Sequence, residues 1–167
     1  MLEIYPLDIA AEISYAREWW DSRNPAFADF SDMGGDCTSF VSQCLMAGGA
    51  VMNFTRDTGW YYRSLGDRAA AWTGVEYFYR FITTNRGAGP FGRNIPVSDA
   101  GAGDVIQLCA GNGCYHSLFV IGRENGEPLV AAHSFDAIDR PLSSYDYFSA
   151  RALNIRYARR YVSRRRP

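Results

Sequence analysis

Residues 103–135, GDVIQLCAGNGCYHSLFVIGRENGEPLVAAHSF, decide the fold class of this chain. The segments GDVIQLC, YHSLFVIG and EPLVAAHSF are short and apolar, and glycine-containing turns separate them. Asn125-Gly126 is the strongest short signal for a two-residue hairpin turn. The stretch therefore predicts an antiparallel meander, and residues 150–162, ARALNIRYARRYV, predict one more strand.

The chain before this meander has the periodicity of helices. Apolar residues recur at helical spacing over residues 7–20, with Asp8 as the cap. The same spacing begins at Cys37 and stops at Gly48-Gly49, and a further helix is predicted over residues 72–83, with a loop, RGAGPFGRNIP, after it. Helices followed by antiparallel strands predict an α+β fold.

The composition is that of a globular protein. The 167 residues are 47% hydrophobic, 15% aromatic and 21% charged, which is enough to fill one core. No linker or repeat divides the sequence, so we expect a single domain over residues 1–167. The formal net charge is -1, and the one charge run, Arg164-Arg165-Arg166, is interpreted as a solvated chain end. Nucleic-acid and membrane-surface binding are therefore not expected.

The location of the protein is inferred from what its sequence lacks. No stretch approaches the roughly 20 apolar residues of a membrane span. The amino terminus, MLEIYPLDIAAEIS, has no basic region before an apolar run, so no signal peptide is expected. As written the chain is predicted to be cytoplasmic; trimmed of a leader, it would belong to the cell wall or the secreted fraction. The chain has no lysine, which excludes Schiff-base chemistry and a lysine base.

A cysteine begins the second predicted helix in the stretch GGDCTSFVSQCL, residues 34–45. The free N–H groups of a helix start favour a thiolate and could stabilise an oxyanion, so Cys37 is a candidate nucleophile. Asp36 is placed to cap this helix. Cys37 also lies on the apolar stripe, so a buried structural thiol is the alternative, and Cys44 on the same face is interpreted as core.

A catalytic cysteine needs a base, and the sequence holds only two histidines, His116 and His133. A regular hairpin at Asn125-Gly126 places both imidazoles on one face as diagonal neighbours, so that His133 could orient His116. Asp136 faces the other way in this register. A one-residue bulge in the hairpin would turn Asp136 to the face of His116, so Asp136 remains the second candidate for orienting His116.

The turn CAGNGC brings further polar residues toward His116. A symmetric turn places Gln107 opposite His116, as a hydrogen-bond partner or as an ordinary polar strand residue. Cys109 and Cys114 become cross-strand neighbours, which form a disulfide in an oxidising compartment or remain thiols in the cytoplasm. A zinc site of these two cysteines with His116 is the rival interpretation, but the spacing is unusual and no fourth ligand is evident. We expect no metal.

Several blocks, in this order, resemble the putative amidase family of bacteria, a branch of the papain-like superfamily that includes the NlpC-like cell-wall peptidases. The blocks are GGDCTSFVSQCLMAGG, GDVIQL, YHSLFVIG and LVAAHSFDAIDRPLSSY, and YAREWWDSRNPAFADF and AWTGVEYFYRFI also match. The resemblance covers most of the chain. Ser39 departs from it, because asparagine is expected two positions after the cysteine.

The resemblance implies a papain-like, NlpC-like α+β fold with the cysteine helix packed on an antiparallel sheet. It implies Cys37 as nucleophile, His116 as general base and His133 as the residue that orients the base, with no cofactor. The expected activity is amide hydrolysis through a thioester, on short peptides or peptidoglycan stem peptides. The alternative is a catalytically silent module that binds a peptide or a partner protein.

Overall fold

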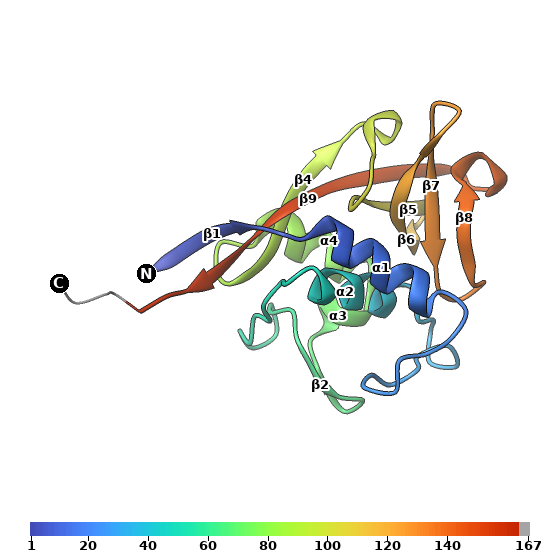
Figure 1. The fold of residues 1–167 in the computed structure, drawn as a ribbon. Helices are drawn as coiled ribbons and strands as arrows, with labels where there is room; N and C mark the ends of the chain where they lie inside the picture. The colour runs from blue at the N-terminus through green and yellow to red at the C-terminus, as the bar shows by residue number, and fades with distance from the viewer. Residues whose placement is uncertain (164–167) are drawn as a thin grey trace.

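A curled antiparallel sheet with helices packed against it forms the protein in a computed structural model, which describes residues 1–163 (Figure 1). The fold is therefore α+β, as predicted. The C-terminal arginine run, residues 164–166, lies outside the described residues.

Four α-helices and two short 3-10 helices cover the described chain. They are α1 (Ile9–Trp19), α2 (Cys37–Ala47), α3 (Ala70–Thr73), α4 (Val75–Thr84), η1 (Val97–Asp99) and η2 (Leu142–Ser144). Asp8 caps α1 as predicted, because its carboxylate accepts the backbone N–H of Ala11 at 3.0 Å. The helix predicted over residues 72–83 is instead two helices, α3 and α4, that meet at Gly74.

Seven strands form the main sheet, in the order β1-β9-β5-β6-β7-β8, and β4 pairs with β9 beside this path. Two short strands, β2 and β3, pair with each other separately. The strands are β1 (Leu2–Pro6), β2 (Tyr62–Ser64), β3 (Asp67–Arg68), β4 (Gly89–Ile95), β5 (Val105–Ala110), β6 (Gly113–Glu124), β7 (Glu127–Ala132), β8 (Ala137–Pro141) and β9 (Ser149–Tyr161). The predicted meander is present as β5, β6 and β7 and is extended by β8, and β9 returns across the sheet to pair with β5, β4 and β1.

Three strands of the main sheet were not predicted from the sequence. Most of the expected loop at residues 86–96 is the strand β4, whose pairing with β9 is interrupted by an irregularity between Phe91 and Arg93. The N-terminal strand β1 precedes the first helix, so the order of helices first and strands afterwards is wrong for this edge of the sheet. β8 follows a turn in which Ser134 and Phe135 both have positive φ, a conformation that sequence periodicity does not reveal.

The main core lies between α2 and the sheet. Phe40, Cys44 and Leu45 from α2 are fully buried and belong to one apolar cluster with Phe119 of β6 and Leu153 of β9. Cys44 is therefore a core residue, as predicted. This packing holds the N-terminal end of α2 against β6, where the candidate residues lie.

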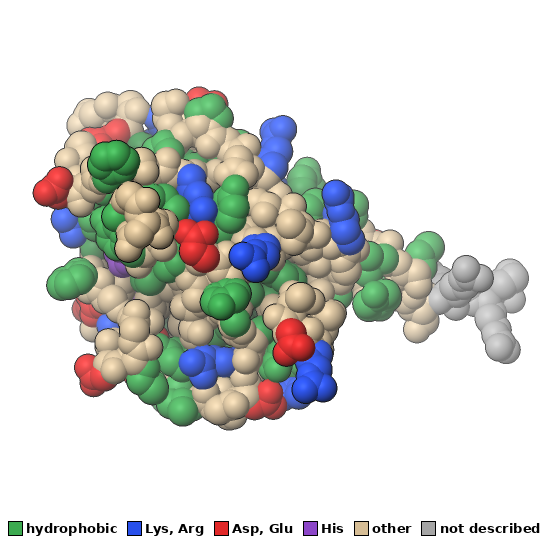
Figure 2. Space-filling view, turned by 180° about the vertical axis from the view of Figure 1, so that it is seen from behind, with side chains coloured by type: hydrophobic (Ala, Val, Ile, Leu, Met, Phe, Trp, Pro, Cys, Tyr) green, Lys and Arg blue, Asp and Glu red, His purple; other side chains and the backbone are tan. Residues whose placement is uncertain are grey.

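The surface shows charges of both signs. On the face drawn in Figure 2, acidic and basic side chains lie singly among hydrophobic and other groups, with no broad area of one sign. Within residues 1–163, no helix combines the length and the apolar character that a membrane crossing requires.

Candidate active site

Cys37 is the first residue of α2 and lines a cavity of about 710 Å³. Its Sγ lies 3.8 Å from Thr38 Oγ1, and Thr38 Oγ1 lies 2.9 Å from Ser117 Oγ on β6. Gly34 and Gly35 line the same cavity with φ values of 94° and 109°, which favour glycine. The backbone before Cys37 therefore borders the cavity without side chains.

Burial keeps the Cys37 thiol protonated at neutral pH. Only 6% of the residue is exposed, and this burial raises the pKa of the thiol, although a backbone hydrogen bond from Ser117 opposes the shift. The helix start therefore does not by itself produce a thiolate. Because the thiolate is the nucleophile, Cys37 would need a base that removes its proton during attack.

His116 lies on β6 and lines the same cavity as Cys37. Burial, together with the positive charge of Arg140, lowers the pKa of His116 to about 4. The imidazole is therefore neutral at pH 7 and able to accept a proton. No hydrogen bond joins His116 to Cys37 in the described chain, and His116 Nε2 is buried without a hydrogen-bond partner.

We expect Arg140→Gln to raise the pKa of His116, because the substitution removes the positive charge that disfavours the imidazolium. The measurement is an NMR titration of the His116 ring between pH 3 and 8. Arg56→Gln is the matched control, since the Arg56 side chain is 96% exposed and lies outside the cavity lining. An unchanged or lower His116 pKa in Arg140→Gln would contradict this electrostatic account.

The structure does not place His133 beside His116. His133 is fully buried, with Nδ1 2.6 Å from Asp36 Oδ2 and Nε2 2.7 Å from the carbonyl oxygen of Trp19. Its ring stacks on Phe40 with the centroids 3.9 Å apart. Both ring nitrogens are thus occupied, and His133 does not supply the hydrogen bond that was predicted to orient His116.

A bulge in the β6–β7 hairpin explains why the two histidines separate. Near the turn, Gly122 pairs with Leu129, as the two-residue turn predicts. Beyond Ile121, however, Val120 pairs with Val130, so one extra residue has entered β6. Each side chain beyond the bulge therefore changes its partner by one position, and the predicted shared face is lost.

The two aspartates that were predicted as secondary candidates form ion pairs away from His116. Asp36 occupies the N-cap position of α2, but its side chain makes no capping bond and accepts the backbone N–H of Phe30 at 2.9 Å instead. Arg23 Nε lies 3.6 Å from Asp36 Oδ2, and the Arg23 guanidinium pairs with Asp136 at 2.9 Å. Neither Asp36 nor Asp136 orients His116.

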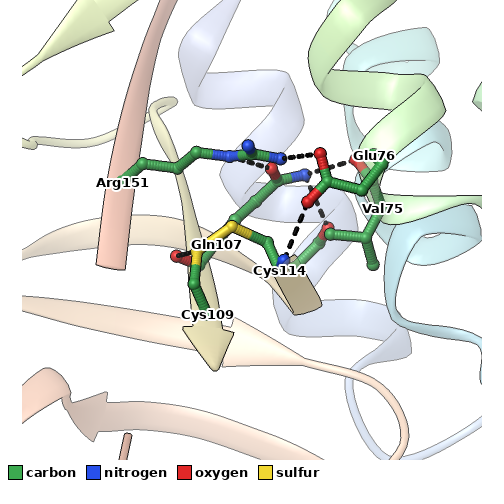
Figure 3. The surroundings of a disulfide bond; sticks show 7 residues. Val75, Glu76, Gln107, Cys109, Cys114 and Arg151 are labelled. Carbon is green, nitrogen blue, oxygen red and sulfur yellow. Dashed lines mark hydrogen bonds and ion pairs between the residues drawn. A yellow bond between two sulfur atoms is a disulfide. The ribbon is translucent and has the colours of Figure 1, made fainter. Parts of the chain in front are cut away.

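Gln107 reaches the site through Ser117 and not through His116. A second bulge in β6 makes Gln107 pair with Ser117, whereas Leu108 pairs with His116. The Gln107 amide donates to Ser117 Oγ at 3.1 Å and to the carbonyl of Val75 at 3.0 Å, and its oxygen accepts from Arg151 at 2.8 Å (Figure 3). This chain of polar contacts supports the Ser117 and Thr38 hydroxyls beside Cys37.

Cys109 and Cys114 form a disulfide between β5 and β6, one of the two states left open by the sequence. Glu76 accepts the backbone N–H of Cys114 at 2.7 Å and pairs with Arg151 at 3.1 Å, which joins α4 to this end of the sheet (Figure 3). With both sulfurs in the disulfide, the rival zinc set is not formed. Residues 1–163 hold no group of three or more metal-ligating side chains.

Three residues that the structure places at the site were not singled out from the sequence. Ser117 follows His116 directly and supports the cysteine, whereas Arg140 and Tyr145 line the cavity from beyond β7. Ser117 had a local signal, because it is a polar residue inside an apolar strand. Arg140 and Tyr145 had no local signal in the sequence, because their positions depend on the turns that follow β7.

Comparison with known proteins assigns the chain to a family. Residues 7–156 match the model of the family described as "Putative amidase domain". The chain belongs to this family. The chain is also 35% identical over 162 residues to the uncharacterized protein YhbB of Bacillus subtilis (strain 168), and this match covers 92% of the chain and 50% of YhbB. The chain thus spans about half the length of this relative. No solved structure gave a significant match to the chain.

Proposed function

We propose that the protein is a cysteine-dependent amide hydrolase in which Cys37 is the nucleophile and His116 the general base. One observation carries the proposal. Cys37 from α2 and His116 from β6, which are far apart in the sequence, line one cavity of about 710 Å³. A volume of this size is usual for small-molecule and peptide sites.

The arrangement around the cavity supports a papain-like fold for this hydrolase. Helix α2, which begins at Cys37, packs against the antiparallel sheet (Figure 1). Strand β6 of that sheet bears His116. The family match, with its name referring to amide hydrolysis, agrees with this chemistry.

In the proposed reaction, neutral His116 takes the proton of the Cys37 thiol as sulfur attacks the amide carbonyl. Backbone N–H groups at the start of α2 stabilise the oxyanion. His116 then protonates the leaving amine, and water, activated by the same imidazole, hydrolyses the thioester. Since the resting thiol and imidazole are both neutral, proton transfer accompanies attack and no thiolate–imidazolium pair is needed beforehand.

The proposed substrates are short peptides or peptidoglycan stem peptides. The cavity has aromatic and apolar walls from Phe135, Tyr115 and Leu108, and charged groups from Arg140 and Asp146. Phe135 is 87% exposed and Tyr115 52% exposed, so both are available to contact a ligand. Such mixed walls suit a peptide that has both apolar and charged groups.

The proposal is tested by incubating wild type, Cys37→Ala and His116→Ala with a library of peptides and muropeptides. We expect wild type to release an amine and to carry a transient acyl group on Cys37 in mass spectra, whereas both variants lose at least about 100-fold in rate. Cys44→Ala is the control, because Cys44 is the other free cysteine and is fully buried. Undiminished hydrolysis by Cys37→Ala would overturn the mechanism, and binding without any turnover would favour the silent peptide-binding module.

A further inference from the structure

Two buried polar atoms at the wall of the cavity lack hydrogen-bond partners. They are His116 Nε2 and the hydroxyl of Tyr145, and both residues line the cavity with Cys37. Buried polar atoms in folded proteins are nearly always hydrogen-bonded, so each unsatisfied atom calls for an explanation. Because the two residues are neighbours in space, one explanation can serve for both atoms: they interact with each other.

The rings that carry the two atoms are neighbours in the wall of the cavity. The ring centroids of His116 and Tyr145 are 6.3 Å apart, and the rings are inclined at 53°. Because a phenol hydroxyl projects well beyond its ring, the polar atoms can come closer than the centroids do. The hydrogen bond requires a rotation of one of the two side chains or one water between the two atoms, and such bonds often tighten only when substrate is bound.

Tyr145 is held in place by its surroundings. It directly follows η2, and its backbone N–H donates to the carbonyl of Leu142 at 3.1 Å. The Arg140 guanidinium lies 3.6 Å from the centre of the Tyr145 ring and is itself fixed by a 2.8 Å bond to Ser144 Oγ. The tyrosine is thus placed by a small cluster of its own and does not depend on His116 for its position.

The other candidates for this role are occupied. Both nitrogens of His133 have oxygen partners, Asp136 pairs with Arg23, and Gln107 is bonded to Ser117, Val75 and Arg151. The cavity wall offers one further charged acceptor, Asp146, which is exposed to solvent. Among these residues, Tyr145 has a buried hydroxyl beside His116, and the Arg140 guanidinium next to this hydroxyl can only donate to it, so the oxygen stays able to accept the proton of His116 Nε2.

We propose that Tyr145 is the positioning residue for His116, with its hydroxyl accepting the Nε2–H proton directly or through one water. The inference rests on the proposed function, since it gives His116 the partner that neither His133 nor Asp136 supplies. Fixing the proton on Nε2 leaves Nδ1 as the basic nitrogen, and a hydroxyl can accept from both the neutral and the charged ring. Burial raises the pKa of Tyr145, so the group remains a neutral phenol at pH 7.

The experiment compares wild type with Tyr145→Phe, which removes only the hydroxyl, and with Tyr147→Phe as the matched control outside the cavity lining. Ring ¹⁵N shifts of His116 at pH 7 report its tautomer without any need for turnover. We expect wild type and Tyr147→Phe to be mainly Nε2–H, and Tyr145→Phe to be a mixture. Iodoacetamide labelling of Cys37 should slow about 10-fold or more in Tyr145→Phe alone.

Each outcome decides between the possibilities. A wild-type His116 with its proton on Nδ1 would overturn the proposal whether or not Tyr145→Phe folds, and so would a tautomer and labelling rate unchanged by Tyr145→Phe. If wild type hydrolyses no peptide but shows the expected tautomer and its dependence on Tyr145, the proposed function fails while the positioning role stands. If peptides are hydrolysed, a lower kcat with little change in KM in Tyr145→Phe is expected.

Discussion

Replacing His133 with alanine is expected to lower the free energy of unfolding by about 3–5 kcal/mol. The substitution leaves the Asp36 carboxylate, which is 1% exposed, without its 2.6 Å partner, and it also removes the ring that stacks on Phe40. Asp36 keeps Arg23 and the Phe30 N–H as neighbours. The loss therefore comes from one charge-assisted hydrogen bond together with the cavity left by a fully buried ring, and removal of a large buried ring alone costs about 3–5 kcal/mol. Urea unfolding at pH 7 measures the effect.

The matched control is His116→Ala. His116 lines the cavity and, within residues 1–163, forms no ion pair with a buried carboxylate, so this variant should cost only about 1 kcal/mol while removing the proposed base. The double variant Asp36→Ala/His133→Ala should cost clearly less than the sum of its single variants, because the pair acts as a unit. Equal stability losses for His116→Ala and His133→Ala would contradict the separate roles assigned to the two histidines.

The substitution Glu12→Gln should stabilise the protein by an amount that grows with pH. Glu12 lies on α1, is fully buried, and has no hydrogen-bond partner for either carboxylate oxygen. Burial raises its pKa from 4.5 to about 9, so the folded protein keeps the carboxyl protonated at neutral pH whereas the unfolded chain ionises it. The stability that this carboxyl contributes is fully present below pH 4.5 and is lost as the pH rises through 9.

Because one pKa unit corresponds to about 1.4 kcal/mol, the advantage of Glu12→Gln over wild type should grow by on the order of 4 kcal/mol between pH 4.5 and 8. Urea unfolding at both pH values gives the difference. Glu18→Gln, at an exposed position of the same helix, should show no such trend. An advantage that is constant with pH would mean that Glu12 is ionised in the folded protein.

Local signals in the sequence predicted the helices α1 and α2 and the strands β5, β6, β7 and β9. Asp8 and Gly48 mark helix ends by short-range chemistry, and such marks can be recognised without the fold. Strand β4 was missed because glycine and proline in GPFGRNI favour a loop locally, while its pairing with β9 is a long-range contact. The burial of Glu12 was missed for the same reason, since periodicity alone would place a glutamate on the solvent side.

The candidate site was predictable in its two principal residues and not in their surroundings. The helix start singled out Cys37, the family resemblance selected His116 from the two histidines, and the structure places both residues in the lining of one cavity. The partner of His116 was not predictable, because the bulge at Ile121 decides which residues lie near it. A bulge depends on how two strands pair and leaves no mark in the residues themselves.

The bulge at Ile121 also sets the tolerance of this hairpin to insertions and deletions. Residues 122–129 pair in their own regular register around Asn125-Gly126, so changes of length at the turn leave the pairing of Val120 with Val130 unaltered. Between the bulge and His116, by contrast, side chains alternate between the two faces at every residue. Loss of one residue there would turn the imidazole out of the cavity, whereas loss of two would restore the face. Among relatives, we therefore expect insertions and deletions of any length at the Asn125-Gly126 turn. Between His116 and Ile121 we expect only those that add or remove an even number of residues.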